Sequence, residues 1–72
     1  MLNKRSYKLI KIVKDKNYYI ESSEVIVKHT ENFKTLEYVC KFTQPYLNEN
    51  ESLIAQTYIN NKLIESVGME VR

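Results

Sequence analysis

Few residues in this chain have side chains that commonly carry out catalysis, and they stand far apart. The single histidine, His29, precedes Thr30 and Glu31, but a lone histidine at a strand end is usually a surface residue. The single cysteine, Cys40, falls on an apolar face, where a thiol acts as a small hydrophobic group. The carboxylates are scattered, with no two placed as an acid–base pair. We therefore predict a non-catalytic protein with no cofactor and no metal site.

Basic residues are concentrated at the start of the chain. Residues 1–16 hold six of them against one acidic residue, Asp15, which gives a net charge of +5, whereas the remainder has a net charge of −3. Tyr7, Tyr18 and Tyr19 accompany the basic segment, and small β domains bind single-stranded nucleic acid by stacking bases on aromatic rings beside a positive groove. Because lysines also keep sheet edges from pairing, we treat nucleic-acid binding as the alternative function. Its candidate residues are Lys4, Arg5, Lys8, Lys11, Lys14 and Lys16.

Tyrosine is the most frequent aromatic residue, with six copies against two phenylalanines and no tryptophan. It combines a large contact area with a polar tip and is enriched at protein interfaces. Several tyrosines fall in expected turns or loops and should be exposed. A hairpin in the second half also carries an apolar outer row that needs a partner to cover it. The predicted protein-binding residues are therefore Tyr18, Tyr19, Tyr46, Leu53, Ile59 and Ile64.

The stretch 25–42 is the centre of the predicted fold and allows two interpretations. A hairpin turning at 31–32 would join two strands, because alternation gives it one apolar and one mostly polar face. The apolar face would hold Val25, Val27, Leu36, Tyr38 and Cys40. The rival is a helix at about 31–43, with Thr30 as its N-cap and Pro45 as its stop. The periodicity of apolar residues fits the strand and the helix almost equally well. The β-branched and aromatic residues favour the strand.

The first hairpin is predicted from strands over 6–14 and 18–30, joined by a three-residue loop at 15–17. This register sets Lys11 against Glu21, an attractive pair of opposite charges. The second strand is long, and Ser22-Ser23 is predicted to form a bulge that bends it.

The second hairpin is predicted from strands over 52–59 and 62–71, turning at Asn60-Asn61, because asparagine accepts a positive φ. In this register Tyr58 faces Leu63 and Ile54 faces Val67.

Two further features belong to this half of the chain. Gly68 is expected at a bulge or at a close approach of backbone. The rival to the hairpin is a helix over 50–67, opened by a capping box of Asn48 and Glu51.

The predicted fold is all-β: a small five-stranded antiparallel meander forming a partly open barrel or a curled sheet, with α+β as the alternative. Residues 1–72 form one domain, with 1–5 as a loose arm. One cysteine and a plain N-terminus favour a cytoplasmic protein, and no apolar run is long enough to span a membrane. The predicted core is Ile12, Ile20, Val25, Val27, Leu36, Tyr38, Cys40, Ile54, Leu63 and Val67.

These observations favour a small protein-binding module that occupies a surface on a larger protein. The composition, rich in Lys, Asn, Ile and Glu, resembles that of small accessory proteins of AT-rich bacteria and their phages. For a phage or mobile-element protein, this predicts an inhibitor of a host enzyme or defence complex. We also expect a homodimer, because small domains without disulfides often gain stability by association.

Overall fold

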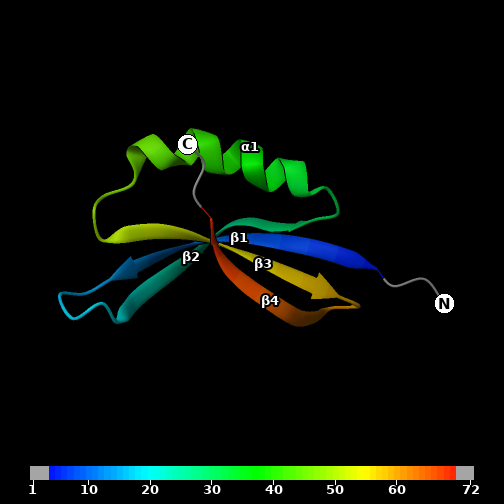
Figure 1. Cartoon of the computed structure of the whole chain (residues 1–72), viewed down its shortest axis with the longest axis horizontal. Coiled ribbons are helices and arrows are strands. Elements are labelled where there is room, and N and C mark those ends of the chain that lie inside the picture. The colour runs from blue at the N-terminus through cyan, green and yellow to red at the C-terminus, as the bar shows by residue number, and fades with distance from the viewer. Residues whose placement is uncertain (1–3, 70–72) are drawn as a thin grey trace.

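Within residues 4–69, which the structure describes, four strands form one antiparallel sheet and one α-helix crosses a single face of it (Figure 1). The fold is mostly β, as predicted, but it is not all-β, because it contains one α-helix and is compatible with the α+β alternative. The fifth strand and the barrel are not confirmed, because the sheet is open and its third predicted strand is helical. The elements of this computed structural model are β1 (Arg5–Lys14), β2 (Ile20–Thr30), α1 (Phe33–Thr43), the 3-10 helix η1 (Gln44–Tyr46), β3 (Glu51–Ile59) and β4 (Lys62–Met69).

The strand order is β2-β1-β3-β4. Both neighbours of β1 run antiparallel to it, so β2 and β3 are parallel to each other. Two parallel strands need a long crossover connection, and α1 lies in that connection. Figure 1 places the helix on one side of the sheet, while the described chain leaves the other side open. We call this second side the open face.

The start of α1 explains why this segment is helical. The Asn32 side-chain oxygen accepts a hydrogen bond from the backbone amide two residues later at 3.0 Å, so Asn32 is the N-cap in place of the predicted Thr30. Leu36 and Cys40, one turn apart, are fully buried. Tyr38 points the other way and is 65% exposed. The predicted hairpin here is therefore wrong, and the segment matches the helix alternative.

The core lies between α1 and the two central strands, β1 and β3. It is a small cluster, consisting of Leu9, Leu36, Cys40, Leu53 and Ala55. The residues that pack around it while partly buried are Tyr7, Ile26, Val27, Val39, Leu47 and Met69. The Tyr7 ring also meets the edge of Phe33 with centroids 5.1 Å apart, which holds the first turn of α1 on β1.

Half of the predicted core differs from the observed one. The buried members are Ile12, Leu36 and Cys40, and the half-buried members are Val27 and Ile54. The other five are exposed, because one of them lies on the outer side of α1 and four lie on the edge strands β2 and β4. These five are Ile20, Val25, Tyr38, Leu63 and Val67.

The first turn is longer than predicted because the Asp15 side chain organises it. The Asp15 Oδ1 atom accepts hydrogen bonds from the backbone amides of Asn17 at 2.8 Å and Tyr19 at 3.0 Å. β2 consequently begins at Ile20, and bulges along β2 shift the register further. Lys11 therefore pairs with Glu24, and the predicted pairing with Glu21 is wrong.

The second hairpin turns where predicted. Asn60 and Asn61 have φ values of 52° and 67°, both in the left-handed region that a two-residue turn requires. Tyr58 faces Leu63 as predicted, but an irregularity in the next step shifts the rest of the register. Ile54 faces Gly68 for this reason, rather than the predicted Val67.

Two expectations about this half are corrected. An added Cβ at Gly68 would meet nothing within 4 Å, so this glycine does not mark a close approach of backbone. The segment 50–67 is not a helix. Asn48 and Glu51 do bond to each other, since the Asn48 amide donates to Glu51 Oε1 at 2.8 Å, but they close a turn that leads into β3.

Candidate protein-binding surface

The predicted protein-binding residues are spread over the molecule. Tyr18 and Tyr19 are exposed in the β1–β2 turn, and Tyr46 is exposed in η1. Ile64 is exposed on β4, in the hairpin that lies at the opposite end of the sheet from the β1–β2 turn (Figure 1). Leu53 is only 2% exposed and belongs to the core.

The remaining member, Ile59, is half-buried at the end of β3. The predicted surface of Leu53, Ile59 and Ile64 therefore does not exist as one face. The bulge in the second hairpin and the helix over Leu53 separate these three side chains.

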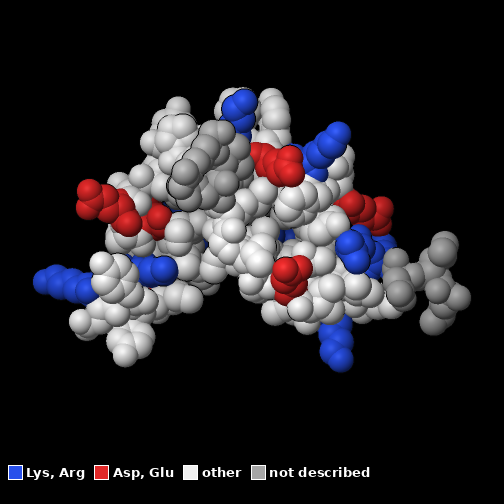
Figure 2. Space-filling view, viewed as in Figure 1, with Lys and Arg blue, Asp and Glu red and all other residues white. Residues whose placement is uncertain are grey.

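The predicted basic groove is also divided. Lys4 lies 3.7 Å from Glu31, and Lys11 lies between two glutamates on the helix side of the sheet. Because side chains alternate along β1, Lys8 and Lys14 project from the open face instead. Figure 2 shows basic and acidic side chains interspersed over the visible face, with no continuous basic strip.

Lys11 and Glu51 form the best-defined ion pair, with Nζ and Oε2 3.3 Å apart. A hydrogen bond from the Asn48 backbone amide, followed by one from Lys11, holds the pKa of Glu51 below its ordinary value. The hydrogen bond and the charge attraction between Lys11 and Glu51 raise the pKa of Lys11. This pair joins β1 to the start of β3 and serves the fold at that end of the sheet.

The open face carries an aliphatic hollow at its centre. Ile10 and Ile12 of β1 point away from α1 because Leu9 points toward it, and Ile54 of β3 lies beside them. Together with polar neighbours they line a hollow of about 210 Å³. Its lining residues are Ile10, Ile12, Ile20, Ser23, Ile54 and Gln56. The outline of the molecule is visibly hollowed opposite α1 (Figure 2).

Two residues of β2 extend this aliphatic surface and remain largely in solvent. Ile20 is 61% exposed and Val25, which pairs with Ile10, is 45% exposed. Ile12 forms the floor of the hollow and is 6% exposed. An exposed apolar patch that is continuous over neighbouring strands is typical of interaction sites.

One end of the open face is polar and aromatic. Lys8 Nζ lies 5.2 Å from the centre of the Tyr58 ring, and the His29 ring meets the same tyrosine at 5.6 Å. Ser6 Oγ and His29 Nδ1 are 3.4 Å apart. Serine–histidine pairs in enzymes use a third group to orient the imidazole, and within residues 4–69 no carboxylate bonds to His29. We therefore assign no catalytic role to this contact.

The outer side of α1 offers a second exposed apolar surface. The Tyr38 and Phe42 rings pack together with centroids 4.7 Å apart, and both are mostly exposed. Tyr46 follows one turn later. This row appears in the sequence as aromatic residues four positions apart, once the segment is taken as a helix.

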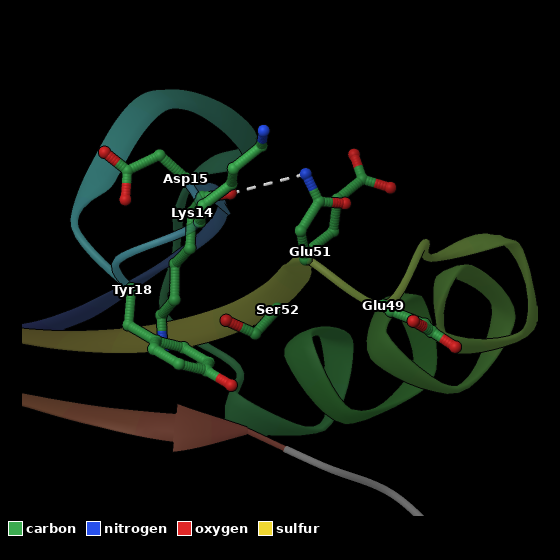
Figure 3. Close-up of a pocket in the computed structure, with 8 residues that line it drawn as sticks. Lys14, Asp15, Tyr18, Glu49, Glu51 and Ser52 are labelled. Atoms are coloured by element: carbon green, nitrogen blue, oxygen red, sulfur yellow. Dashed lines mark hydrogen bonds between the residues drawn. The ribbon is translucent and has the colours of Figure 1, made fainter.

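A pocket of about 310 Å³ lies between the β1–β2 turn and the segment that precedes β3 (Figure 3). Asn50 anchors its wall, since its side-chain amide donates to the Lys14 carbonyl at 3.4 Å and its own carbonyl accepts from the Lys14 amide. In Figure 3 the Tyr18 ring lies toward Ser52. Lysines and carboxylates are mixed around the pocket, and the described residues hold no group of His, Cys, Asp and Glu that could bind a metal ion. Its contacts connect the turn to β3.

Comparison of the chain with protein-family models, curated proteins and solved structures finds no match. None of the helices in residues 4–69 is long and apolar enough to cross a membrane.

Proposed function

We propose that this protein is a non-catalytic protein-binding module whose open face contacts a larger protein partner. The observation that carries the proposal is the uncovered aliphatic surface of Ile10, Ile20, Val25 and Ile54 on neighbouring strands. Full burial of such a side chain is worth about 1.5–3 kcal/mol. Ile20 is 61% exposed, so more than half of that free energy is still available to a partner.

The chemistry of the open face favours a protein over a nucleic acid. Sheets that bind single strands place aromatic rings where bases stack. Here the centre of the face is aliphatic, and Tyr58 and His29 lie at one end. Two cations of the basic segment, Lys4 and Lys11, are also engaged by glutamates. Binding of single-stranded nucleic acid by the basic first hairpin remains our alternative function, and the contact of Lys8 with the Tyr58 ring is the observation on the open face that favours it.

For a protein encoded by a phage or mobile element, the partner would be a host enzyme or defence complex, and binding would inhibit it. A module of 72 residues blocks a larger protein by covering a functional surface. A standard protein interface buries about 800 Å² on each partner, which a surface of 5787 Å² can provide.

A set of matched variants tests which surface binds. Ile20→Thr with Val25→Thr removes exposed aliphatic area from the open face and keeps β-branched residues that suit strands. Ile64→Thr removes a similarly exposed side chain from β4, and Phe42→Ser removes one from the outer side of α1. Each variant is immobilised and exposed to host lysate with and without nuclease treatment, and circular dichroism checks its fold.

We expect the open-face variant to lose the captured protein while the β4 and α1 variants keep it. If Phe42→Ser alone abolished capture of the partner protein, the binding surface would lie on α1. Capture that disappears on nuclease treatment, together with salt-sensitive binding to generic single-stranded DNA, would favour the nucleic-acid alternative.

A further inference from the structure

We propose that the occupant of the open face is an α-helix of the partner whose apolar stripe is flanked by Asp or Glu residues. This inference rests on the proposed function and names the chemistry of the partner. Three features of the face support it: its mainly aliphatic centre, its hollow shape, and its charge.

The backbone of the occupant must satisfy its own hydrogen bonds. Three strands contribute to the hollow, and the two beneath its centre, β1 and β3, already pair with a neighbour on each side, whereas β2 is an edge strand. The hollow is lined mainly by isoleucine side chains, which neither donate nor accept hydrogen bonds. An extended peptide lying there would leave backbone groups buried and unpaired, at a cost in free energy. A helix pairs its backbone internally and avoids this cost.

The covered side of the same sheet illustrates how a helix fits. α1 sets Leu36 and Cys40, one turn apart, against Leu9 of β1 and Leu53 of β3. On the open face the intervening positions of these two strands present Ile10, Ile12 and Ile54. A second helix would therefore meet an aliphatic row from the same pair of strands and would complete a layer on each side of the sheet.

The charge of the face selects an acidic helix. The open-face positions of β1 and β3 include Lys8 and Lys14, one on each side of the isoleucines, and no carboxylate. Asp15 and Glu21 line a pocket with Lys14 at the β1–β2 turn, where Lys16 adds a further positive charge. Six residues of strand separate the two lysines by about 20 Å, a distance that about 13 helical residues span. A second copy of this chain would bring the same lysines without carboxylates from these strands to meet them, so the arrangement favours a different protein.

Synthetic helical peptides of about 15 residues test the inference on the full chain. The first peptide carries Ile or Leu at helical spacing with glutamates at both ends. The second replaces these glutamates with lysines, and the third is a scrambled form of the first. Binding is followed by fluorescence anisotropy and by the amide shifts of the protein in two-dimensional NMR.

We expect the acidic peptide to bind about tenfold more tightly than the basic one, since two ion pairs at the rim replace two repulsions. The amides of Ile10, Val25 and Ile54 should shift. Lys8→Gln with Lys14→Gln removes the positive charge at both positions and should remove most of the preference. The corresponding Glu variants should reverse it.

One result would overturn the inference and leave the proposed function standing. It is equal binding of the acidic and basic peptides, or none, by a protein that still loses its captured partner through Ile20→Thr with Val25→Thr. A wild type that sediments as a dimer with its open-face amides shifting on dilution would overturn both, because a second copy would then occupy the open face. Retention of the captured partner by the open-face variant would overturn the proposed function itself.

Discussion

Leu36→Ala removes the side chain that seats α1 on the sheet, and it distinguishes the observed helix from the strand that the sequence favoured. Leu36 is fully buried in a cluster of five residues, so truncation leaves a cavity at the centre of a small core. Such truncations cost about 2–5 kcal/mol. We expect about 3 kcal/mol, because the helix rests on the sheet from one side and can shift to close part of the cavity.

Tyr38→Ala in the same helix is the matched control. Tyr38 is 65% exposed, and the change removes one ring contact, with Phe42. Alanine favours the helix at both positions, and the gain in helix propensity is larger at Tyr38 because tyrosine is a poorer helix former than leucine, which further lowers the cost of Tyr38→Ala. We expect Tyr38→Ala to cost less than about 1 kcal/mol.

Urea unfolding followed by far-UV circular dichroism measures both free energies of unfolding. A domain of 72 residues has a total stability of roughly 4–11 kcal/mol, so Leu36→Ala should lower the midpoint strongly or leave the chain partly unfolded. In the strand interpretation both side chains share one buried face, so the two truncations would lower the free energy of unfolding by similar amounts. Similar losses for the two variants, or a loss below about 1 kcal/mol for Leu36→Ala, would refute the position of α1.

Two other predictions concern the sheet. Because the Asn48 amide and Lys11 lower the pKa of Glu51 in the folded state, its contribution to stability is present above the ordinary pKa of 4.5 and is lost as the pH falls through the lower folded value. Glu51→Gln should therefore lower the Tm at pH 7 and change it much less at pH 3, while Glu49→Gln should change neither; an equal drop at both pH values would contradict the ion pair. Asn61 has a φ of 67°, so Asn61→Gly should be neutral or stabilising by up to about 1 kcal/mol in thermal unfolding, and Asn61→Ala should destabilise.

Local chemistry made part of the fold predictable from the sequence. Asn60 and Asn61 both tolerate the left-handed conformation, and the strands on either side of them alternate, so this hairpin was predicted with its turn in place. The register beyond Leu63 was wrong because a bulge inserts one residue. Nothing in the alternation of side chains reports such an insertion.

The helix was harder to predict because its stability depends on distant residues. Apolar periodicity nearly tied between the two interpretations, and the β-branched and aromatic residues of α1 favoured a strand. The burial of Leu36 and Cys40 against Leu9 and Leu53 outweighs that preference. These contacts join segments far apart in the chain, so a local reading does not include them.

The candidate surface was predicted in part. Tyr18, Tyr19 and Tyr46 are exposed as expected, since turns and short helices place them outside the core. Their separation in space depends on the fold and could not be predicted from the sequence. Ile20 and Val25 were predicted in the core, because alternation identifies an apolar face but does not say whether anything covers it.

The incorrect placement of Ile20 and Val25 in the core is related to the proposed function, because both residues lie on the open face. An antiparallel sheet with one face in water ordinarily carries polar residues on that face. β1 departs from this pattern, because Leu9 lies on one face while Ile10 and Ile12 lie on the other. A strand that is apolar on both faces suits a sheet covered on both sides. Within the described chain α1 covers one side only, and the partner helix that we propose is a layer that the isoleucines and flanking lysines of the second side would fit.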